Sequence, residues 1–130
     1  MLHAMGQRKT SLYRRYIGRR NQEDGRVSME DEITSTLLGP LAFLSKRDSA
    51  YFWYHLLKSG CKRTIADTPP ESADIQLWPR RHGIEPDMHV VLSWPDGRTH
   101  TLLIELKWTA PLSGDDQLYR QWQEYLTDSE

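Results

Sequence analysis

Two stretches in which apolar and polar residues alternate, residues 84–92 and 99–108, flank the segment Trp94-Pro95-Asp96-Gly97. Alternation with a period of two predicts β-strands. Proline favours the first central position of a type I turn, and glycine tolerates the left-handed conformation that follows. We therefore predict a β-hairpin with a three-residue loop from Pro95 to Gly97. This hairpin restricts the chain to folds that contain an antiparallel strand pair.

A three-residue loop fixes the register of the hairpin, because it pairs the residue before the loop with the residue after it. Continued along the strands, this register places Asp87 opposite Glu105 and Glu85 opposite Lys107. All four side chains lie on one face, because side chains alternate between faces. His89 belongs to the same face. The opposite face is predicted to enter the core and carries Met88, Val90, Leu92, Leu102, Ile104 and Leu106.

The opposed carboxylates Asp87 and Glu105 are an unfavourable feature of a plain hairpin. Like charges placed directly opposite destabilise a strand pair by roughly 0.2 to 1 kcal/mol unless a positive group lies between them. A divalent cation is one such group, because carboxylate oxygens are hard ligands and an octahedral Mg²⁺ keeps positions for water and a substrate phosphate. The alternative is a solvated polar face on which Glu85 and Lys107 form a surface ion pair worth under about 1 kcal/mol.

Helical spacing of apolar residues predicts two helices before the hairpin. The first begins at Ser28, a residue type suited to cap a helix, and carries acidic residues in its first turn, where the helix dipole favours them. Gly39-Pro40 should kink or split it, because proline removes a hydrogen bond. The second helix is predicted over residues 49–58, capped by Asp48 and ended by Gly60. Its apolar stripe consists of Phe52, Trp53, Leu56 and Leu57.

The remaining elements are a strand and a terminal helix. Residues 74–78 alternate weakly and predict a strand before the hairpin. A segment that ends near Leu126 predicts a helix capped near Ser113 or Asp115. The expected order is two helices, three strands and one helix, which is an α/β or α+β arrangement.

Charge divides the chain into two parts. The length of 130 residues corresponds to one compact domain, and the net charge of -1 does not indicate a polyanionic partner. Residues 1–28, however, hold seven Arg and Lys against two acidic residues. We predict a basic, flexible arm at 1–28 and a domain at 29–130. Two interpretations of this arm stay open: it contacts phosphates of a nucleic acid, or it is a solvated tail. Its arginines include Arg14, Arg15, Arg19 and Arg20.

The single cysteine, Cys61, cannot form an internal disulfide, so nothing requires an oxidising compartment. We find no apolar run near the roughly 18 residues that span a bilayer, and no continuous apolar core of a secretion signal. We therefore expect a cytoplasmic protein without membrane contact.

The charged residues of the hairpin resemble the PD-(D/E)XK nuclease superfamily, which has the restriction-endonuclease-like fold. Pro86-Asp87 is followed on the next strand by Glu105-Leu106-Lys107. Glu30 resembles the acidic residue that many members carry on their first core helix, and Gln117 resembles the glutamine of a related subgroup. The resemblance covers about residues 29–126.

This resemblance implies a three-layer core with N-terminal helices, a central mixed β-sheet whose hairpin carries the site, and a C-terminal helix. It implies a nuclease in which Asp87, Glu105 and the backbone carbonyl of Leu106 bind Mg²⁺ or Mn²⁺, and in which Glu30 completes the metal shell. Lys107 would orient or deprotonate the attacking water in phosphodiester hydrolysis.

Two of these assignments have rivals in the sequence. For Glu30 the rivals are Asp31 and Glu32. The alternative role for all three is to stabilise the helix through its dipole, without a part in the site. Gln117 is expected to position water, the lysine or a phosphate. Gln121 lies one helical turn further on, and Gln121 with Tyr125 fits a similar pattern.

The expected substrate is nucleic acid, DNA rather than RNA, and Arg80 and Arg81 are further candidates for phosphate contact. The alternative is a catalytically inactive nuclease-fold module that binds nucleic acid or a protein partner. The superfamily core usually continues with a strand after the glutamine-bearing helix, whereas this sequence ends at Glu130. We therefore expect the last core strand to be missing, and an exposed sheet edge of this kind would favour a homodimer.

Overall fold

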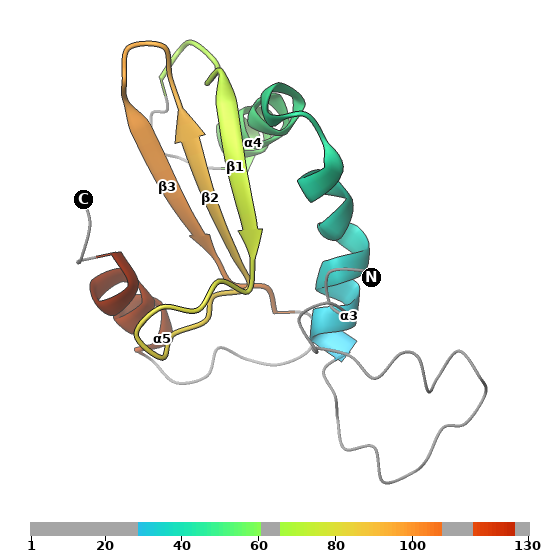
Figure 1. The fold of residues 1–130 in the computed structure, drawn as a ribbon, viewed down its shortest axis with the longest axis vertical. Coiled ribbons are helices and arrows are strands. Elements are labelled where there is room, and N and C mark those ends of the chain that lie inside the picture. Colours follow the sequence, from blue (N-terminus) through green and yellow to red (C-terminus); the bar gives the residue numbers. More distant parts are fainter. Residues whose placement is uncertain (1–28, 61–65, 108–115, 127–130) are drawn as a thin grey trace, which may run out of the picture.

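The computed structural model describes residues 29–60, 66–107 and 116–126, and within them all side chains except those of 29–32 and 117. These residues form a mixed α and β structure around a three-stranded sheet (Figure 1). The elements in chain order are helix α3 (Met29–Leu37), 3-10 helix η1 (Gly39–Phe43), helix α4 (Lys46–Gly60), strands β1 (Ser72–Leu77), β2 (Met88–Ser93) and β3 (Thr99–Ile104), helix α5 (Gln117–Arg120) and π-helix η2 (Gln121–Tyr125). This order is the predicted one.

The sheet has the order β1-β2-β3 and is antiparallel at both junctions, so the expectation of a mixed sheet is wrong for the described strands. The physical reason is that short connections join β1 to β2 and β2 to β3, whereas parallel neighbours need a long crossover. β1 and β3 are the outer strands of this sheet. Dimerisation through a sheet edge stays a prediction.

The hairpin has the predicted loop and the predicted register. Ser93 pairs with Thr99 and Met88 pairs with Ile104. At the loop, the Trp94 backbone N–H donates to the Arg98 carbonyl at 2.9 Å, and Gly97 has a φ of 84°. The left-handed backbone at this position explains the glycine.

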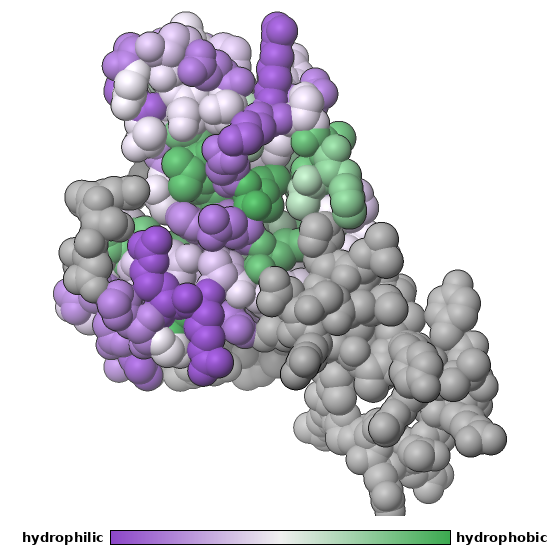
Figure 2. Space-filling view, viewed as in Figure 1, coloured by the Kyte–Doolittle hydropathy of each residue, from purple (hydrophilic) through white to green (hydrophobic). Residues whose placement is uncertain are grey.

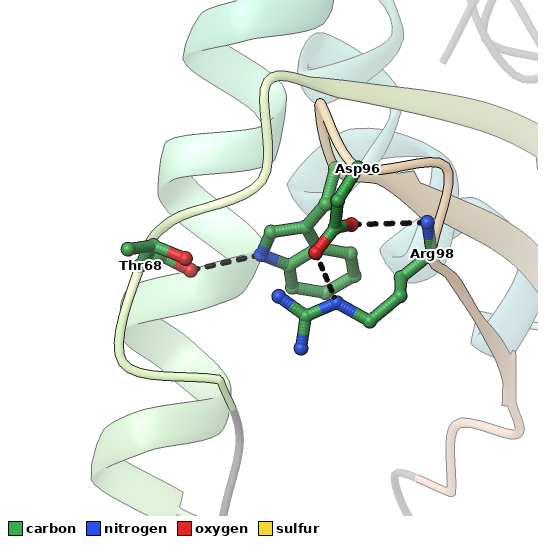
Figure 3. Close-up of polar contacts among 4 residues, drawn as sticks. Thr68, Asp96 and Arg98 are labelled. Atoms are coloured by element: carbon green, nitrogen blue, oxygen red, sulfur yellow. Dashed lines mark hydrogen bonds and ion pairs between the residues drawn. The ribbon is translucent and has the colours of Figure 1, made fainter.

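Side chains close the loop of the hairpin (Figure 3). The Asp96 carboxylate accepts a hydrogen bond from the Arg98 backbone N–H at 3.1 Å and one from Arg98 Nε at 2.6 Å. The indole Nε1 of Trp94 donates to the carbonyl of Thr68 at 2.9 Å, which ties the loop to the segment before β1.

Both hairpin strands are shorter than predicted, because β2 begins at Met88 and β3 ends at Ile104. Pro86 has no N–H to donate to a ladder. Upstream of it, Arg81 and Ile84 close a tight turn by exchanging two backbone hydrogen bonds of 2.9 Å. The chain therefore turns through residues 81–87 before it enters β2.

The core lies between one face of the sheet and α4. Met88, Val90 and Leu92 are completely buried, as the alternation predicts. They pack in one cluster with Ala50 and Trp53 of α4. Leu102 and Ile104 complete this face and are partly buried.

Of the two predicted N-terminal helices, the second differs more from its prediction than the first. α3 ends at Leu37 and η1 follows with Pro40 in its first turn, so the predicted split is confirmed. The predicted cap of α4, Asp48, is wrong. Ser45 holds the cap position, because its Oγ accepts from the Asp48 backbone N–H at 3.1 Å and donates to the Asp48 carboxylate at 2.6 Å.

The buried stripe of α4 is also rotated from the predicted one. Trp53 is buried, but Phe52 is 37% and Leu56 is 48% exposed. Tyr54 is buried instead, because its hydroxyl donates to the carbonyl of Asp67 at 2.6 Å. A tyrosine with a satisfied hydroxyl can enter a core that a phenylalanine was expected to fill.

Several predictions fall on residues that the structure does not describe. They are the basic arm at 1–28, the cap Ser28, Cys61, and the caps Ser113 and Asp115. Within the described ranges, we find no helix of the length and apolar character that crossing a membrane requires.

Candidate active site

The predicted site residues gather at the end of the sheet where β2 begins and β3 finishes. Asp87 lies one residue before β2, and Glu105 lies one residue after β3. The Trp78 backbone N–H, just past the end of β1, donates to the carbonyl of Asp87 at 3.0 Å. All three strands thus contribute to this end, and α5 lies beside it (Figure 1).

The carboxylate of Asp87 replaces a main-chain acceptor. Its Oδ2 accepts a hydrogen bond from the backbone N–H of Leu106 at 2.7 Å. Leu106 lies beyond the last ladder pair, so its N–H would otherwise lack the partner that a continued strand provides. Asp87 is therefore held against the segment that carries Glu105 and Lys107.

Glu105 is the centre of a buried polar group. Its side chain is 8% exposed and that of Lys107 is 22% exposed. Glu105 Oε1 accepts from Lys107 Nζ at 2.7 Å, and Oε2 accepts from Gln121 Nε2 at 2.9 Å. Burial of a carboxylate is costly unless it is paired and hydrogen-bonded, and both conditions are met here.

The glutamine that reaches Glu105 is Gln121, the alternative in the sequence, from η2. Gln121 and Tyr125 are 5% and 1% exposed, so both face inward. A π-helix has more than four residues per turn, which brings positions i and i+4 to nearly the same side. The side chain of Gln117 lies outside the described residues.

Tyr125 forms a second contact group beside the site. Its ring lies 5.5 Å from that of His89 and 5.0 Å from the Arg81 guanidinium, centre to centre. Arg81 Nη1 also donates to the Tyr125 carbonyl at 3.3 Å. Burial raises the pKa of the Tyr125 hydroxyl, and the positive charge of Arg81 partly opposes that rise.

These contacts concern two residues of the sequence analysis. Arg81 is exposed and packs on the ring of Tyr125, and its contact with phosphate stays a prediction. The signal that points to Tyr125 is its spacing of four residues from Gln121. His89 was placed on the correct face, and it brings η2 onto the face of the sheet opposite α4.

A cavity lies beside Trp78, whose backbone N–H contacts Asp87, and it does not contain the predicted catalytic residues. It has a volume of about 590 Å³ and is lined by residues 75–80 together with Ala42 and Glu85. Asp87, Glu105 and Lys107 do not line it. Arg80, a predicted phosphate contact, is exposed and lines this cavity.

The chemistry of the donors fits a hard divalent cation in part. Asp87 and Glu105 are two carboxylates of the kind that bind Mg²⁺ together with water. Within the residues that the structure describes, no group of three or more His, Cys, Asp or Glu side chains could hold a metal. Glu30 lies in α3, but its side chain is outside the described set, as are Arg14, Arg15, Arg19 and Arg20.

Comparison of the chain with models of protein families, with curated proteins and with solved structures gives no match.

Proposed function

We propose that this protein is a metal-dependent nuclease that hydrolyses phosphodiester bonds of nucleic acid, DNA rather than RNA. The observation that carries the proposal is the Glu105 carboxylate, which accepts hydrogen bonds from both Lys107 and Gln121. The Asp87 carboxylate accepts a hydrogen bond from the backbone N–H of Leu106, the residue that follows Glu105. An acid pair, an amine and an amide are thereby concentrated at one end of a sheet.

Each group has a role in this reaction. Asp87 and Glu105 would hold Mg²⁺ or Mn²⁺, with the Leu106 carbonyl and Glu30 as further ligands. The bound metal would polarise a phosphoryl oxygen and lower the pKa of water. Lys107 donates hydrogen bonds and carries a positive charge, so it can orient a water molecule and offset negative charge on the phosphate. Gln121 fixes the orientation of Glu105.

A restriction-endonuclease-like core is part of the proposal. Two features support it: α4 covers one face of the sheet, and Tyr125 of η2 meets His89 on the other. The antiparallel hairpin carries both acidic residues at its open end, as the PD-(D/E)XK arrangement requires.

The test is cleavage of labelled single-stranded and duplex DNA and RNA by the purified protein with Mg²⁺, Mn²⁺ or EDTA. Asp87→Asn keeps an oxygen for the Leu106 N–H and removes the charge, so it should fold and lose cleavage. Lys107→Gln keeps a hydrogen-bond donor and removes the positive charge, so it should do the same. Matched controls are Asp74→Asn on β1 and Lys58→Gln on α4, since both residues are exposed.

Metal-dependent cleavage that is lost in the two site variants and kept in the two controls would support the nuclease. Cleavage that survives both site variants, or no cleavage by folded protein, would contradict it. The second outcome favours the alternative, a catalytically inactive binding module. One observation suits that alternative: both oxygens of Glu105 already have protein partners.

A further inference from the structure

The connection between β1 and β2, residues 78–87, concentrates left-handed backbone. Among the residues that the structure describes, Trp78 and His82 are the two other than glycine with a positive φ, at 48° and 52°. Gly83 follows with a φ of 79°. His82 and Gly83 form the tip of the connection, where a two-residue hairpin loop favours a positive φ at both central positions. Trp78 lies outside this loop, so the loop does not explain its conformation.

Trp78 is poorly suited to a left-handed backbone for two reasons. A bulky side chain makes a residue with a positive φ a conformational outlier. The residue before a proline also favours extended backbone, and Pro79 follows Trp78. Such strain persists only where the surrounding structure enforces it, and it gathers at functional sites. The conformation of Trp78 is therefore held by its surroundings.

The indole of Trp78 is an apolar anchor for a polar turn. Trp78 is 4% exposed, whereas the next residues but one, Arg80, Arg81 and His82, are exposed. Figure 2 shows strongly hydrophilic side chains over the part of the surface where Figure 1 places α5 and this connection. Burial of an aromatic side chain stabilises by an amount comparable with the cost of a strained residue. The buried ring can thus hold residue 78 in its left-handed conformation.

The left-handed residue changes the direction of the connection. The Trp78 N–H donates to the Asp87 carbonyl at 3.0 Å, which extends the pairing of β1 with β2. Hydrogen-bonded pairs recur at every second position of a regular antiparallel ladder. Instead Arg81 and Ile84, each three residues further on, exchange hydrogen bonds of 2.9 Å. The ladder is therefore interrupted after Trp78, and Figure 1 shows the connection leaving the line of β1 and running toward α5.

Asp87 lies where the connection returns to the sheet, opposite Trp78. Its carbonyl accepts from the Trp78 N–H, and its carboxylate accepts from the Leu106 N–H at 2.7 Å. The connection leaves the sheet at Trp78 and re-enters it at Asp87, so the direction set at the first residue is the direction from which the second arrives. An extended Trp78 would carry the connection straight on along β1. The Asp87 carboxylate would then lose its alignment with Leu106.

We propose that Trp78 is a positioning residue of the candidate site, and that its left-handed backbone directs the carboxylate of Asp87 toward Leu106 and Glu105. The inference rests on the proposed nuclease function for the role of Asp87, and it adds a residue that acts only through that carboxylate. The position of the carboxylate can be measured without cleavage, because the Leu106 N–H bonds to it.

Glycine and alanine at residue 78 separate the backbone from the ring. Both remove the indole, and alanine leaves the smaller cavity, but only glycine adopts a left-handed φ freely. In isothermal titration calorimetry with Mn²⁺, the Kd of Trp78→Ala should exceed that of Trp78→Gly about 5- to 30-fold, which is the penalty of a left-handed backbone for a residue with a side chain. In NMR spectra, the Leu106 amide proton should keep the low-field position of an N–H bonded to a carboxylate in Trp78→Gly and lose it in Trp78→Ala.

A variant that keeps the indole makes the test independent of the loss of the ring. Pro79→Ala removes the proline that disfavours right-handed backbone at residue 78, so it should raise the Kd for Mn²⁺ and shift the Leu106 amide. In the folded wild type, a strong cross-peak between the amide and α protons of Trp78 should report the positive φ. His82→Ala and His82→Gly are the matched controls, because His82 has a similar φ at the exposed tip. These two controls should agree in both measurements.

Equal Mn²⁺ affinity and equal Leu106 shifts in Trp78→Gly and Trp78→Ala would overturn the proposal. Tighter binding by Trp78→Ala would do the same, because a role in packing alone favours the larger side chain. If neither variant folds, an unchanged Kd and Leu106 amide in Pro79→Ala overturns it, as does a negative φ of Trp78 in the wild type. Failure of the nuclease looks different: the Leu106 amide would still distinguish Trp78→Gly from Trp78→Ala, while no protein binds Mn²⁺ or cleaves nucleic acid.

Discussion

Two regions of the sheet are stabilised in different ways. One is the face that packs against α4, and the other is the end that carries Asp87 and Glu105, here called the open end. On the α4 side, Val90 and Leu92 meet Trp53 in a cluster without charged groups. At the open end, Glu105 is buried and is held by Lys107 and Gln121. The first region gains stability from removing apolar surface from water, whereas the second balances desolvation with hydrogen bonds. Changes in the two regions should therefore separate stability from activity.

The largest effect on stability is expected on the α4 side. Trp53→Ala should lower the free energy of unfolding by about 3 to 5 kcal/mol, because it empties a buried site. Phe52→Ala, at the neighbouring position with 37% exposure, should cost much less. Urea unfolding monitored by circular dichroism measures both. Equal losses would contradict the position of the buried stripe.

An intermediate effect is expected at the open end, where activity should fall more than stability. Gln121→Leu keeps the size of the side chain but removes the donor to Glu105. We expect a loss of about 1.5 to 3 kcal/mol in unfolding free energy, typical of a hydrogen bond to a charged group, and cleavage reduced at least about tenfold. Gln123→Leu, exposed on the same turn, is the control. Full activity of Gln121→Leu would remove the glutamine from the site.

The smallest effect concerns pH. The pKa of Tyr125 is raised by burial, so the unfolded chain ionises this hydroxyl at lower pH than the folded one. Its stabilising contribution is complete below the ordinary tyrosine pKa of about 10 and is lost as pH rises through the folded pKa. Tyr125→Phe should therefore flatten the alkaline decline of unfolding free energy between neutral and strongly alkaline pH, as measured by urea unfolding at a series of pH values. A decline that is the same in the wild type and in Tyr125→Phe would contradict the assignment.

Sequence reasoning was strongest where the physics is local. The hairpin register follows from side-chain alternation and from Gly97, and both act within a few residues. The core face of β2 was predicted for the same reason. Nothing beyond the hairpin itself was needed to place Asp87 close to the segment of Glu105.

Sequence reasoning was weakest where distant groups decide. Tyr54 is buried because the carbonyl of Asp67, far along the chain, satisfies its hydroxyl. Gln117 and Gln121 both fit the pattern in the sequence, and the contact of Gln121 with Glu105 depends on how η2 packs against the site. The strand pair reaches only to Met88 and Ile104, because the chain turns at Arg81 and Ile84 before it enters β2. Alternation of apolar and polar residues does not predict such a turn.

The bond from Leu106 to Asp87 has a consequence for folding fidelity. A hairpin shifted by two residues would still present apolar side chains to α4, because the pattern repeats every second position. It would, however, separate Asp87 from the Leu106 N–H and strain the turn at Gly97. A misaligned chain could thus be compact and yet lack the site, so specific activity would report how accurately a preparation had aligned its strands.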